Sequence, residues 1–359
     1  MSDADLASRT PATIAFYISG HGFGHAARDV ELIRALLEAR PALSVFVRTT
    51  VTPALFEPIA GGRVDVQRAE TDTGLTQRDS LTIDEEDSAR PAPPFYATLD
   101  RRAAAEAEWL RASAVDLVVG DIPPLAFAAA ARAGIPSVAL GNFTWDWIYS
   151  IYPAFAALAP DVLPIIRDAY AHATRALRLP LHGGFAAMEN VIVDIPFIAR
   201  KSARDRGETR RAATVDNGRP GVLPSFGAYG AALPYDTLRR DGRLTVLDPT
   251  RVPDGFRYQD LVAAADVVVT KPGYGIVSEC AANGTPLLYT SRGRFVEYDV
   301  FVAEMPRILR CRYISQEDLL AGRWADAVDA LLAQPAPPER ARIDGAGIAA
   351  GEILRMSTC

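Results

Sequence analysis

Lysine and cysteine are scarce in this chain, and each shortage narrows the possible classes of protein. Lysine occurs only as Lys201 and Lys271, although lysine and arginine together number 38, so a lysine within a motif is notable. The three cysteines, Cys280, Cys311 and Cys359, show no paired spacing and no C-x-x-C motif. This usage is unlike that of a disulfide framework or a cysteine metal site, and it fits a reducing compartment. We therefore expect a cytoplasmic protein.

Long apolar runs and an excess of positive charge are also absent. No segment of about 18 consecutive apolar residues occurs. The first 12 residues lack the basic start and apolar core of a signal peptide. The net charge of −6 offers no basic excess for a polyphosphate backbone. We expect no integral membrane segment and no nucleic-acid partner, while the oligomeric state stays open.

Short β-branched segments alternate with helix-like segments along the chain, which is 359 residues long and 49% hydrophobic. This alternation predicts an α/β fold built on parallel sheets. In the first half, strands are predicted at 13–19, 43–49, 64–69, 115–121, 136–142 and 190–196, and helices at 27–39, 95–113 and 124–134. In the second half, strands are predicted at 221–227, 243–248, 265–270, 285–291 and 307–314.

Two polar segments interrupt the alternation. Residues 71–94 are acidic and rich in proline, which predicts a long loop, either a solvated insertion or a mobile lid. Residues 199–220 are dense in charge without apolar periodicity, which is typical of an interdomain connector. The sequence thus predicts a first domain at 1–198, a hinge-like linker at 199–220 and a second domain at 221–359.

The stretch SGHGFGHAARD, residues 19–29, places two of the four histidines in a glycine-rich turn between a predicted strand and a helix. Its glycines give G-x-G-x-G rather than G-x-G-x-x-G, and the second strand ends in Arg48-Thr49-Thr50 without an acidic residue, which disfavours dinucleotide binding. His21 and His25 are four residues apart, so both could face the carboxyl edge of the sheet. A functional pair is favoured over structural imidazoles at a helix start.

Polar and aromatic residues follow the later strands of the first half. Asp121 ends the strand at 115–121 and precedes two prolines, so it either orients a histidine base or caps the next helix. Trp145 and Trp147 lie in the aromatic segment 142–155, which suits either a stacking wall for an acceptor or core packing. Phe23, inside the glycine-rich turn, is a further candidate for acceptor binding.

A strand, a glycine turn and a helix follow one another at 267–290 in the second half. Amide groups around Gly273 and Gly275 could hold a phosphate, and Lys271 adds a positive charge beside them. Glu279 follows within about one helical turn, where it could accept hydrogen bonds from two vicinal hydroxyls. Gly227 lies in a second glycine turn, after the first strand of this domain.

These motifs together resemble a known family. SGHGFGHAAR near the start and TKPGYGIVSECAANGTPLLY late in the chain resemble the GT-B glycosyltransferases of the peptidoglycan N-acetylglucosaminyltransferase and UDP-glycosyltransferase group. With NFTWDWIY and SRGRFVEY added, the chain more closely resembles the glycosyltransferase-like N-terminal region of L-arabinokinase-type proteins. The resemblance spans nearly the whole chain, which lacks a phosphate loop of the sugar-kinase type, so kinase activity is not expected of it.

The resemblance implies two Rossmann-like domains facing across a cleft, with the acceptor in the first and a nucleotide sugar in the second. It implies that His25 is the catalytic base, that His21 is an additional histidine and that Asp121 orients the base. It implies no bound metal and no cofactor besides the nucleotide sugar as co-substrate. The implied nucleotide-site residues are Gly227, Gly273, Tyr274, Gly275 and Glu279, and the implied donor-sugar residues are Arg292 and Glu297. The glutamine usual beside the donor sugar is absent, so the sugar stays open.

The expected function is that of an inverting glycosyltransferase, which moves a sugar from a nucleotide donor, expected to be a UDP sugar, to a small-molecule acceptor. Lys271 would stabilise the departing diphosphate. Two alternatives remain: an epimerase or hydrolase of the sugar nucleotide with the same fold, or a non-catalytic module that binds sugar nucleotides.

Overall fold

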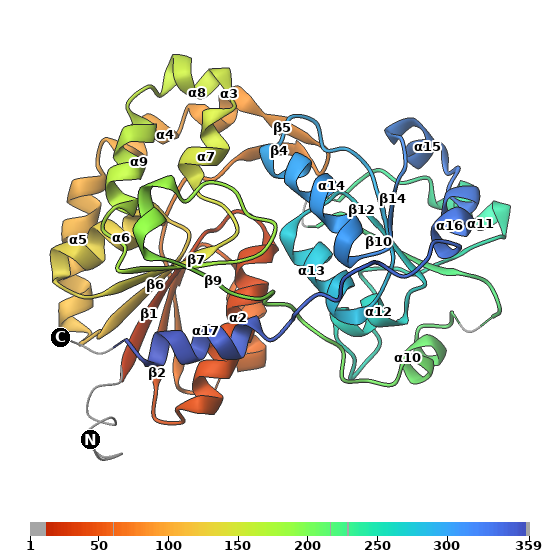
Figure 1. The fold of residues 1–359 in the computed structure, drawn as a ribbon, viewed down its shortest axis with the longest axis horizontal. Coiled ribbons are helices and arrows are strands. Elements are labelled where there is room, and N and C mark those ends of the chain that lie inside the picture. The colour runs from red at the N-terminus through yellow and green to blue at the C-terminus, as the bar shows by residue number, and fades with distance from the viewer. Residues whose placement is uncertain (1–11, 60, 216, 228–229, 357–359) are drawn as a thin grey trace. The chain divides into compact units, whose positions relative to one another are not determined.

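The computed structural model describes residues 12–59, 61–215, 217–227 and 230–356, which form two compact units (Figure 1). Unit 1 holds the described residues within 12–76, 84–198 and 344–356. Unit 2 holds 77–83 and those within 199–343. The chain therefore passes from one unit to the other four times.

Unit 1 is built on a seven-stranded sheet in the order β3-β2-β1-β6-β7-β8-β9. All neighbouring strands are parallel, and the last pair in the register between β1 and β6 is Ile18 with Asp121. Its central strands β1 and β6 are buried along nearly their whole length, which explains their largely apolar sequence. The bounds are β1 (Thr13–Ile18), β2 (Ser44–Thr49), β3 (Val64–Arg68), β6 (Leu117–Asp121), β7 (Ser137–Gly141), β8 (Arg175–Arg178) and β9 (Ile192–Asp194).

Two groups of helices cover this sheet, and Figure 1 shows them on opposite sides of it. One group contains α2 (Phe23–Ala39), α17 (Gly345–Leu354) and the 3₁₀ helix η1 (Pro53–Ile59). The other contains α5 (Leu99–Ala112), α6 (Pro124–Ala133) and α9 (Val162–Tyr170). Shorter helices complete the unit: α7 (Trp145–Ser150), α8 (Pro153–Leu158) and η2 (Ala186–Val191). The sheet order reverses between β1 and β6, which is where ligands bind in open α/β sheets.

The prediction of a long loop at 71–94 is wrong. The strands β4 (Thr76–Asp79) and β5 (Thr82–Asp84) pair into a two-stranded sheet, and α3 (Glu85–Ala89) and α4 (Ala92–Tyr96) follow. Apolar side chains that sequence composition obscured, among them Phe95 and Tyr96, are buried and anchor these helices. The tip between the strands belongs to unit 2, where the Ser80 hydroxyl donates to the carbonyl of Phe226 and Leu81 packs against the core.

Unit 2 has a five-stranded parallel sheet in the order β11-β10-β12-β13-β14. Its core gathers Val222, Val269, Leu288 and Trp324, all fully buried. The strands are β10 (Gly221–Ser225), β11 (Thr245–Val246), β12 (Val267–Thr270), β13 (Leu287–Tyr289) and β14 (Cys311–Tyr313). The helices are α10 (Arg206–Ala212), α11 (Tyr235–Asp241), α12 (Tyr258–Ala264), α13 (Tyr274–Asn283), α14 (Val296–Ile308), α15 (Gln316–Ala321) and α16 (Ala325–Leu332).

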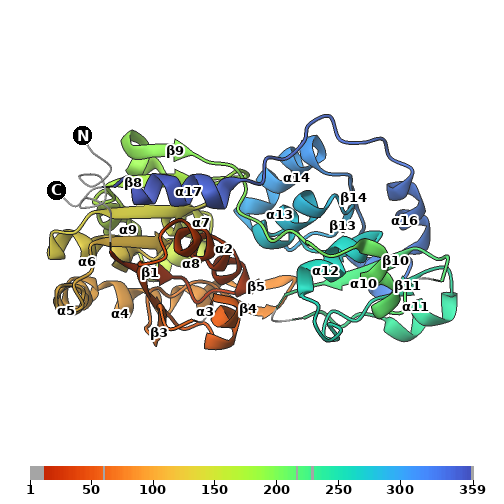
Figure 2. The ribbon, with the colours of Figure 1, turned by 90° about the horizontal axis from the view of Figure 1, so that it is seen from below.

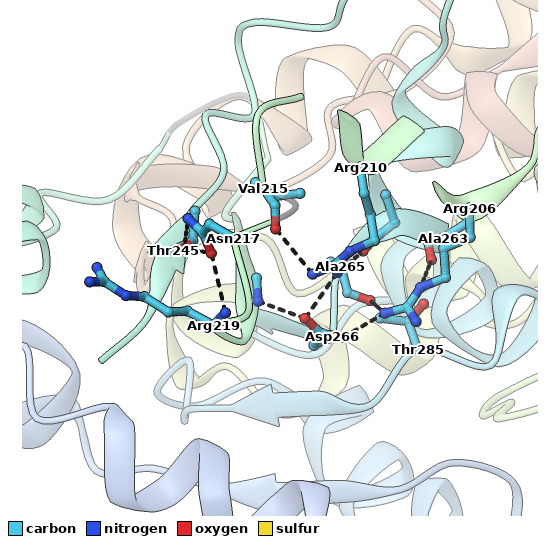
Figure 3. A network of polar contacts seen from close by, with 12 residues as sticks. Arg206, Arg210, Val215, Asn217, Arg219, Thr245, Ala263, Ala265, Asp266 and Thr285 are labelled. Carbon is cyan, nitrogen blue, oxygen red and sulfur yellow. Dashed lines mark hydrogen bonds and ion pairs between the residues drawn. The ribbon is translucent and has the colours of Figure 1, made fainter. Parts of the chain in front are cut away.

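Residues 199–220, predicted as a linker, are instead part of unit 2. Helix α10 packs against α12, and its arginines converge on Asp266 at the start of β12 (Figure 3). Arg206 donates to Oδ1 of Asp266 at 2.6 Å, and Arg210 donates to Oδ2 at 3.0 Å. The backbone amide of Gly221 donates to the same Oδ2 at 2.7 Å. The charged residues that indicated a solvated connector thus include Arg206 and Arg210, which form ion pairs with Asp266.

The second predicted domain, 221–359, also ends differently in the structure, because α17 belongs to unit 1. Helix α17 packs along α2, and Figure 1 and Figure 2 both show the two helices side by side. A Cβ at Gly345 would lie 2.2 Å from the carbonyl oxygen of Pro196, so glycine permits this close approach at the start of the helix. Cys359 lies outside the described residues. No helix in the described part of the chain is both long enough and apolar enough to cross a membrane.

Candidate functional site

The glycine-rich turn after β1 carries both histidines to the carboxyl edge of the sheet in unit 1. Gly20 is required there by packing, since a Cβ on it would lie 1.9 Å from the Thr50 hydroxyl oxygen. Gly22 has a φ of 83° and directly precedes α2, a conformation that glycine adopts without strain. His25 is the third residue of the helix and is 7% exposed.

A buried carboxylate, Asp121, holds His25 and Arg28 together. Nδ1 of His25 lies 2.8 Å from Oδ1 of Asp121. Nε of Arg28 donates to Oδ2 at 2.5 Å, and a second nitrogen of the same guanidinium donates to Oδ1. Arg28 also donates to Asn142 Oδ1 at 3.0 Å. Asp121 itself is fully buried, so the arginine supplies the compensating charge that a buried carboxylate needs.

These contacts fix the tautomer of His25. Burial raises the pKa of Asp121, but the charges and hydrogen bonds of Arg28 and His25 outweigh it and hold that pKa below its usual value. Asp121 is therefore an acceptor only, and Nδ1 of His25 must carry the hydrogen that the 2.8 Å contact requires. The guanidinium nitrogen 3.0 Å from Nδ1 cannot accept, so it donates to the carboxylate instead. Nε2 is thus the lone-pair nitrogen, and it has no hydrogen-bond partner among the described residues.

A second acid, Asp29, lies beside this cluster. It is fully buried, and its two carboxyl oxygens have no hydrogen-bond partner within the described residues. Burial and the nearby Asp121 carboxylate raise the pKa of Asp29 well above its ordinary value, and Arg28 lowers it only in part. Asp29 thus takes up a proton more readily than an ordinary aspartate, whereas Asp121 holds its charge opposite the Arg28 guanidinium.

His21 and the predicted acceptor residues lie around this centre. Nδ1 of His21 accepts from the amide of Leu75 at 3.3 Å, and its ring meets Trp145 edge to face at 5.6 Å. Phe23 is 48% exposed and so is accessible to a ligand. Trp145 is only 1% exposed, and its indole nitrogen donates to Asp72 at 2.8 Å, so it positions a polar group rather than forming an open wall.

Trp147, the second predicted wall residue, packs onto the backbone of the 183–184 loop. A Cβ at Gly183 would lie 2.2 Å from its six-membered ring. The ring is only partly exposed. The structure thus assigns Trp147 mainly to packing within unit 1.

Unit 2 contains the residues predicted to hold a nucleotide. Glu279 on α13 is 4% exposed, and both Nε and a terminal nitrogen of Arg200 contact its Oε1, at 2.6 and 2.5 Å. The guanidinium of Arg200 also lies 5.7 Å from the centre of the Tyr258 ring. The carboxylate predicted to bind a ribose is therefore oriented by an arginine.

Lys271 follows β12 and precedes the start of α13. Gly273 is the residue before this helix and contributes no side-chain cap to the first turn of amides, which includes those of Tyr274 and Gly275. Burial lowers the pKa of Lys271 to about 7, and Arg292 contributes to that lowering, while Glu297 and Asp79 oppose it.

The other predicted donor residues of unit 2 are arranged as follows. Arg292 and Glu297 are 6% and 5% exposed, and Arg292 stacks 3.6 Å from the ring centre of Phe295. Gly227, after β10, has a φ of 70°. No group of three or more histidine, cysteine or acidic side chains in the described residues is arranged as a metal site.

Three residues of these arrangements were not identified from the sequence. Arg28 follows His25 by three positions, a spacing that places both on one face of a helix, and this was the available signal. Arg200 was hidden in the supposed linker, and Asp72 in the supposed loop. The contacts of both depend on segments distant in sequence, so no local pattern marked them.

Comparison with known proteins supports one fold. No family model matches the chain. L-arabinokinase of Arabidopsis thaliana is 31% identical over 341 residues, which cover 89% of this chain and 32% of that protein. The chain thus spans about a third of the length of this curated relative.

Solved structures match over nearly the full chain. The kitacinnamycin glycosyltransferase is 18% identical, covering 97% of this chain and 99% of its own, with a TM-score of 0.62. The calicheamicin glycosyltransferase CalG4 is 16% identical, covering 95% and 97%, with a TM-score of 0.58. Phytolacca americana UGT2, complexed with UDP-2fluoro-glucose and pterostilbene, is 15% identical, covering 96% and 93%, with a TM-score of 0.57. The predicted α/β class with two Rossmann-like domains of the GT-B type is confirmed.

Replacing Arg28 tests the buried charge pair. We expect Arg28→Met to lower the free energy of unfolding by about 3–5 kcal/mol at pH 7, because it leaves the Asp121 carboxylate buried without a compensating charge. Asp121 of the parent has a lowered pKa, so its stabilising contribution is present above the unfolded-state value and is lost only in strong acid. The uncompensated carboxyl of the variant protonates at higher pH, so the difference in stability should narrow as the pH falls. Urea unfolding at several pH values measures both effects.

Arg34→Met on the same helix is the matched control, since Arg34 pairs with Glu31 near the surface. It should cost less than about 1 kcal/mol. Equal losses in the two variants would contradict the assigned role of Arg28.

Proposed function

We propose that this chain, whose fold is that of the GT-B glycosyltransferases, is an inverting glycosyltransferase that uses a UDP sugar and His25 as its base. The observation that carries the proposal is the fixed pair of His25 and Asp121, in which Nδ1 donates to the carboxylate and leaves Nε2 able to accept a proton. The pair lies where the sheet order reverses, the usual place for ligands in this class of sheet.

The chemistry is a single displacement. An acceptor hydroxyl gives its proton to Nε2 of His25 while its oxygen forms a bond to the anomeric carbon. The bond from that carbon to the diphosphate oxygen breaks, and its electron pair remains on the departing diphosphate. Asp121 stabilises the imidazolium that forms, as orienting carboxylates do in other histidine-based sites.

Unit 2 supplies the groups for the donor. Glu279, oriented by Arg200, would accept from the ribose hydroxyls, and the amides around Gly273 and Gly275 together with Lys271 would hold the diphosphate. UGT2 was solved with UDP-2fluoro-glucose and VinC with DTDP, which supports a nucleoside diphosphate donor. VinC is 18% identical with a TM-score of 0.52.

The hydrolase or epimerase alternative would use the same donor site without an organic acceptor. A hydrolase would place water at Nε2 of His25, and an epimerase would return the sugar nucleotide as a stereoisomer. Mass analysis identifies transfer, because only transfer yields a product that contains both sugar and acceptor, and it identifies hydrolysis by the free sugar. An epimer has the mass of the donor and is recognised by its NMR spectrum. A non-catalytic module would bind donor and yield none of these products.

The first test concerns the donor. We expect UDP or a UDP sugar to raise the melting temperature, and Glu279→Ala to weaken binding by about 2–4 kcal/mol, because charged hydrogen bonds to the ribose are lost. Glu304→Ala is the control, since Glu304 lies at the surface of the same unit and pairs with Arg307. Unchanged UDP affinity in Glu279→Ala would remove the ribose assignment.

The second test uses the lowered pKa of Lys271. Below pH 7 the free amine is already protonated, whereas above it the amine must take up a proton to stabilise the diphosphate. We expect the affinity for UDP-glucose to be constant below pH 7 and to fall above it, by up to about tenfold per pH unit. Titration calorimetry from about pH 6 to about pH 8 should show proton uptake on binding above pH 7. Lys271→Met should abolish both the uptake and the slope, and a slope that persists there would exclude Lys271 as its source.

The third test separates the two histidines. His25→Ala should lower turnover by about 10²–10⁴-fold with donor affinity nearly intact, since general-base catalysis contributes about that factor. Asp121→Asn should resemble a weaker form of the same defect. His21→Ala should act mainly on the apparent acceptor affinity. Turnover lost in His21→Ala but kept in His25→Ala would reverse the two roles.

A further inference from the structure

The segment 69–75 follows the carboxyl edge of the sheet in unit 1. The amide of Ala69 donates to the carbonyl of Thr49 at the end of β2. The Thr71 hydroxyl donates to the carbonyl of Ile18 at the end of β1. The hydroxyl of Thr73 lies 3.2 Å from that of Tyr149 on α7. This segment therefore passes over β2 and β1 and brings Asp72 to the turn that carries the histidines.

The far end of the segment is fixed as firmly. Tyr149 donates to the carbonyl of Gly74 at 3.0 Å, and the amide of Leu75 donates to His21. Gly74 has a φ of 60°, and a Cβ there would lie 3.0 Å from the His21 side chain. Contacts from two separate elements thus fix the backbone on both sides of Asp72, which limits the positions its carboxyl group can take.

Asp72 is a partly buried residue whose carboxyl group has two internal donors. The indole nitrogen of Trp145 donates to its Oδ2 at 2.8 Å, and the Ser19 hydroxyl also hydrogen-bonds to it. Burial raises the pKa of Asp72, while Ser19, Trp145 and the charge of His25 lower it. The segment 69–75 thus holds this carboxyl group beside Trp145, next to the turn that carries His25.

Satisfying Trp145 alone does not require an acid, since a neutral carbonyl oxygen also accepts an indole hydrogen. A carboxylate has about four acceptor positions, and the two donors leave further positions for a ligand. An apolar molecule bound against Asp72 would strip water from those positions without replacing its hydrogen bonds, which is costly. A molecule with several hydroxyl groups would replace them.

The surrounding rings suit the same kind of ligand. His21, Trp145, Phe143 and His25 form a continuous series of edge-to-face contacts, with centres 5.6, 5.1 and 5.5 Å apart. Trp145, Phe143 and His25 are 1%, 6% and 7% exposed, so they form a rigid backing for Asp72. The partly exposed His21 ring is the member of the series that a sugar or cyclitol would contact. Asp72 adds a polar anchor beside Trp145 in this series.

We infer that Asp72 is an acceptor-binding residue, which selects a neutral polyol, such as a monosaccharide or cyclitol, over a flat phenolic acceptor. It accepts from one hydroxyl of the polyol, and a second hydroxyl is thereby presented to Nε2 of His25. The inference rests on the proposed function, because it names the class of acceptor for that reaction.

The test compares two classes of acceptor in Asp72→Asn. This variant keeps an oxygen for the Trp145 hydrogen bond but removes the charge. With the nucleotide sugar that stabilises the parent, we expect the KM for D-glucose, a pentose or myo-inositol to rise about 10- to 100-fold, with kcat changed less than about threefold. The kcat/KM for 4-nitrophenol should stay equal or rise, and the melting temperature and UDP affinity should not change. Asp100→Asn is the control, since Asp100 is exposed and pairs with Arg132 on the surface of the same unit.

Each other outcome decides against one proposal. Equal losses for polyols and 4-nitrophenol, or unchanged kinetics with a lower melting temperature, would make Asp72 structural and overturn the inference. Failure of UDP and of all UDP sugars to bind would instead overturn the proposed function. In that case saturation-transfer NMR with the same polyols tests Asp72 directly: signals in the parent that Asp72→Asn loses support the inference, and their absence from the parent overturns it.

Discussion

The buried ion pair of Arg28 and Asp121 organises the carboxyl edge of the sheet in unit 1. A carboxylate without solvent access is tolerated only with a compensating charge, and this one lies at the end of a central strand. Arg28 supplies that charge from α2 and reaches Asn142 after β7, so one guanidinium joins the turn after β1 to two further strand ends. The imidazole of His25 is then placed by the same carboxylate. Its tautomer follows from electrostatics, with no need for a further partner.

Unit 2 contains a second contact in which an arginine orients a buried carboxylate. Arg200 holds Glu279 in place on α13, so an arginine outside the helix orients an acid within it. Lys271 contrasts with both arginines because burial shifts its pKa to about 7. A buried arginine stays protonated, whereas burial lowers the pKa of a lysine. This difference distinguishes Lys271 from the arginines that supply nearly all other basic side chains of the chain. Arginines with a constant charge orient the two acids, whereas the charge of Lys271 varies with pH near neutrality.

The sequence predicted the elements that a local residue pattern specifies. It missed the residues and elements that depend on contacts with segments distant in sequence. Buried strands such as β1, β2 and β6 were located to within about two residues, because continuous β-branched runs have few alternatives. Strand β8, with the sequence RALR, was missed because its two arginines conceal a buried Ala176 and Leu177. Strand ends placed Asp121 at the same edge as the two histidines, since parallel strands bring their carboxyl ends to one edge, and the family resemblance singled out His25 as its partner. Arg200 and Asp72 could not be found that way, because their partners lie 79 and 73 positions away.

The placement of α17 makes unit 2 an insertion within unit 1. The described chain both begins and ends in unit 1, and the intervening block 199–343 leaves and returns near Ile198 and Asp344, which are joined through Phe197 and Gly345. A chimaera that exchanges the block 199–343 would therefore need two junctions, and the tip at 77–83 would have to match the incoming block. A single cut after residue 198 would strip α2 of its packing partner. A functional exchange would therefore replace the internal block 199–343, and not the whole chain after a single cut.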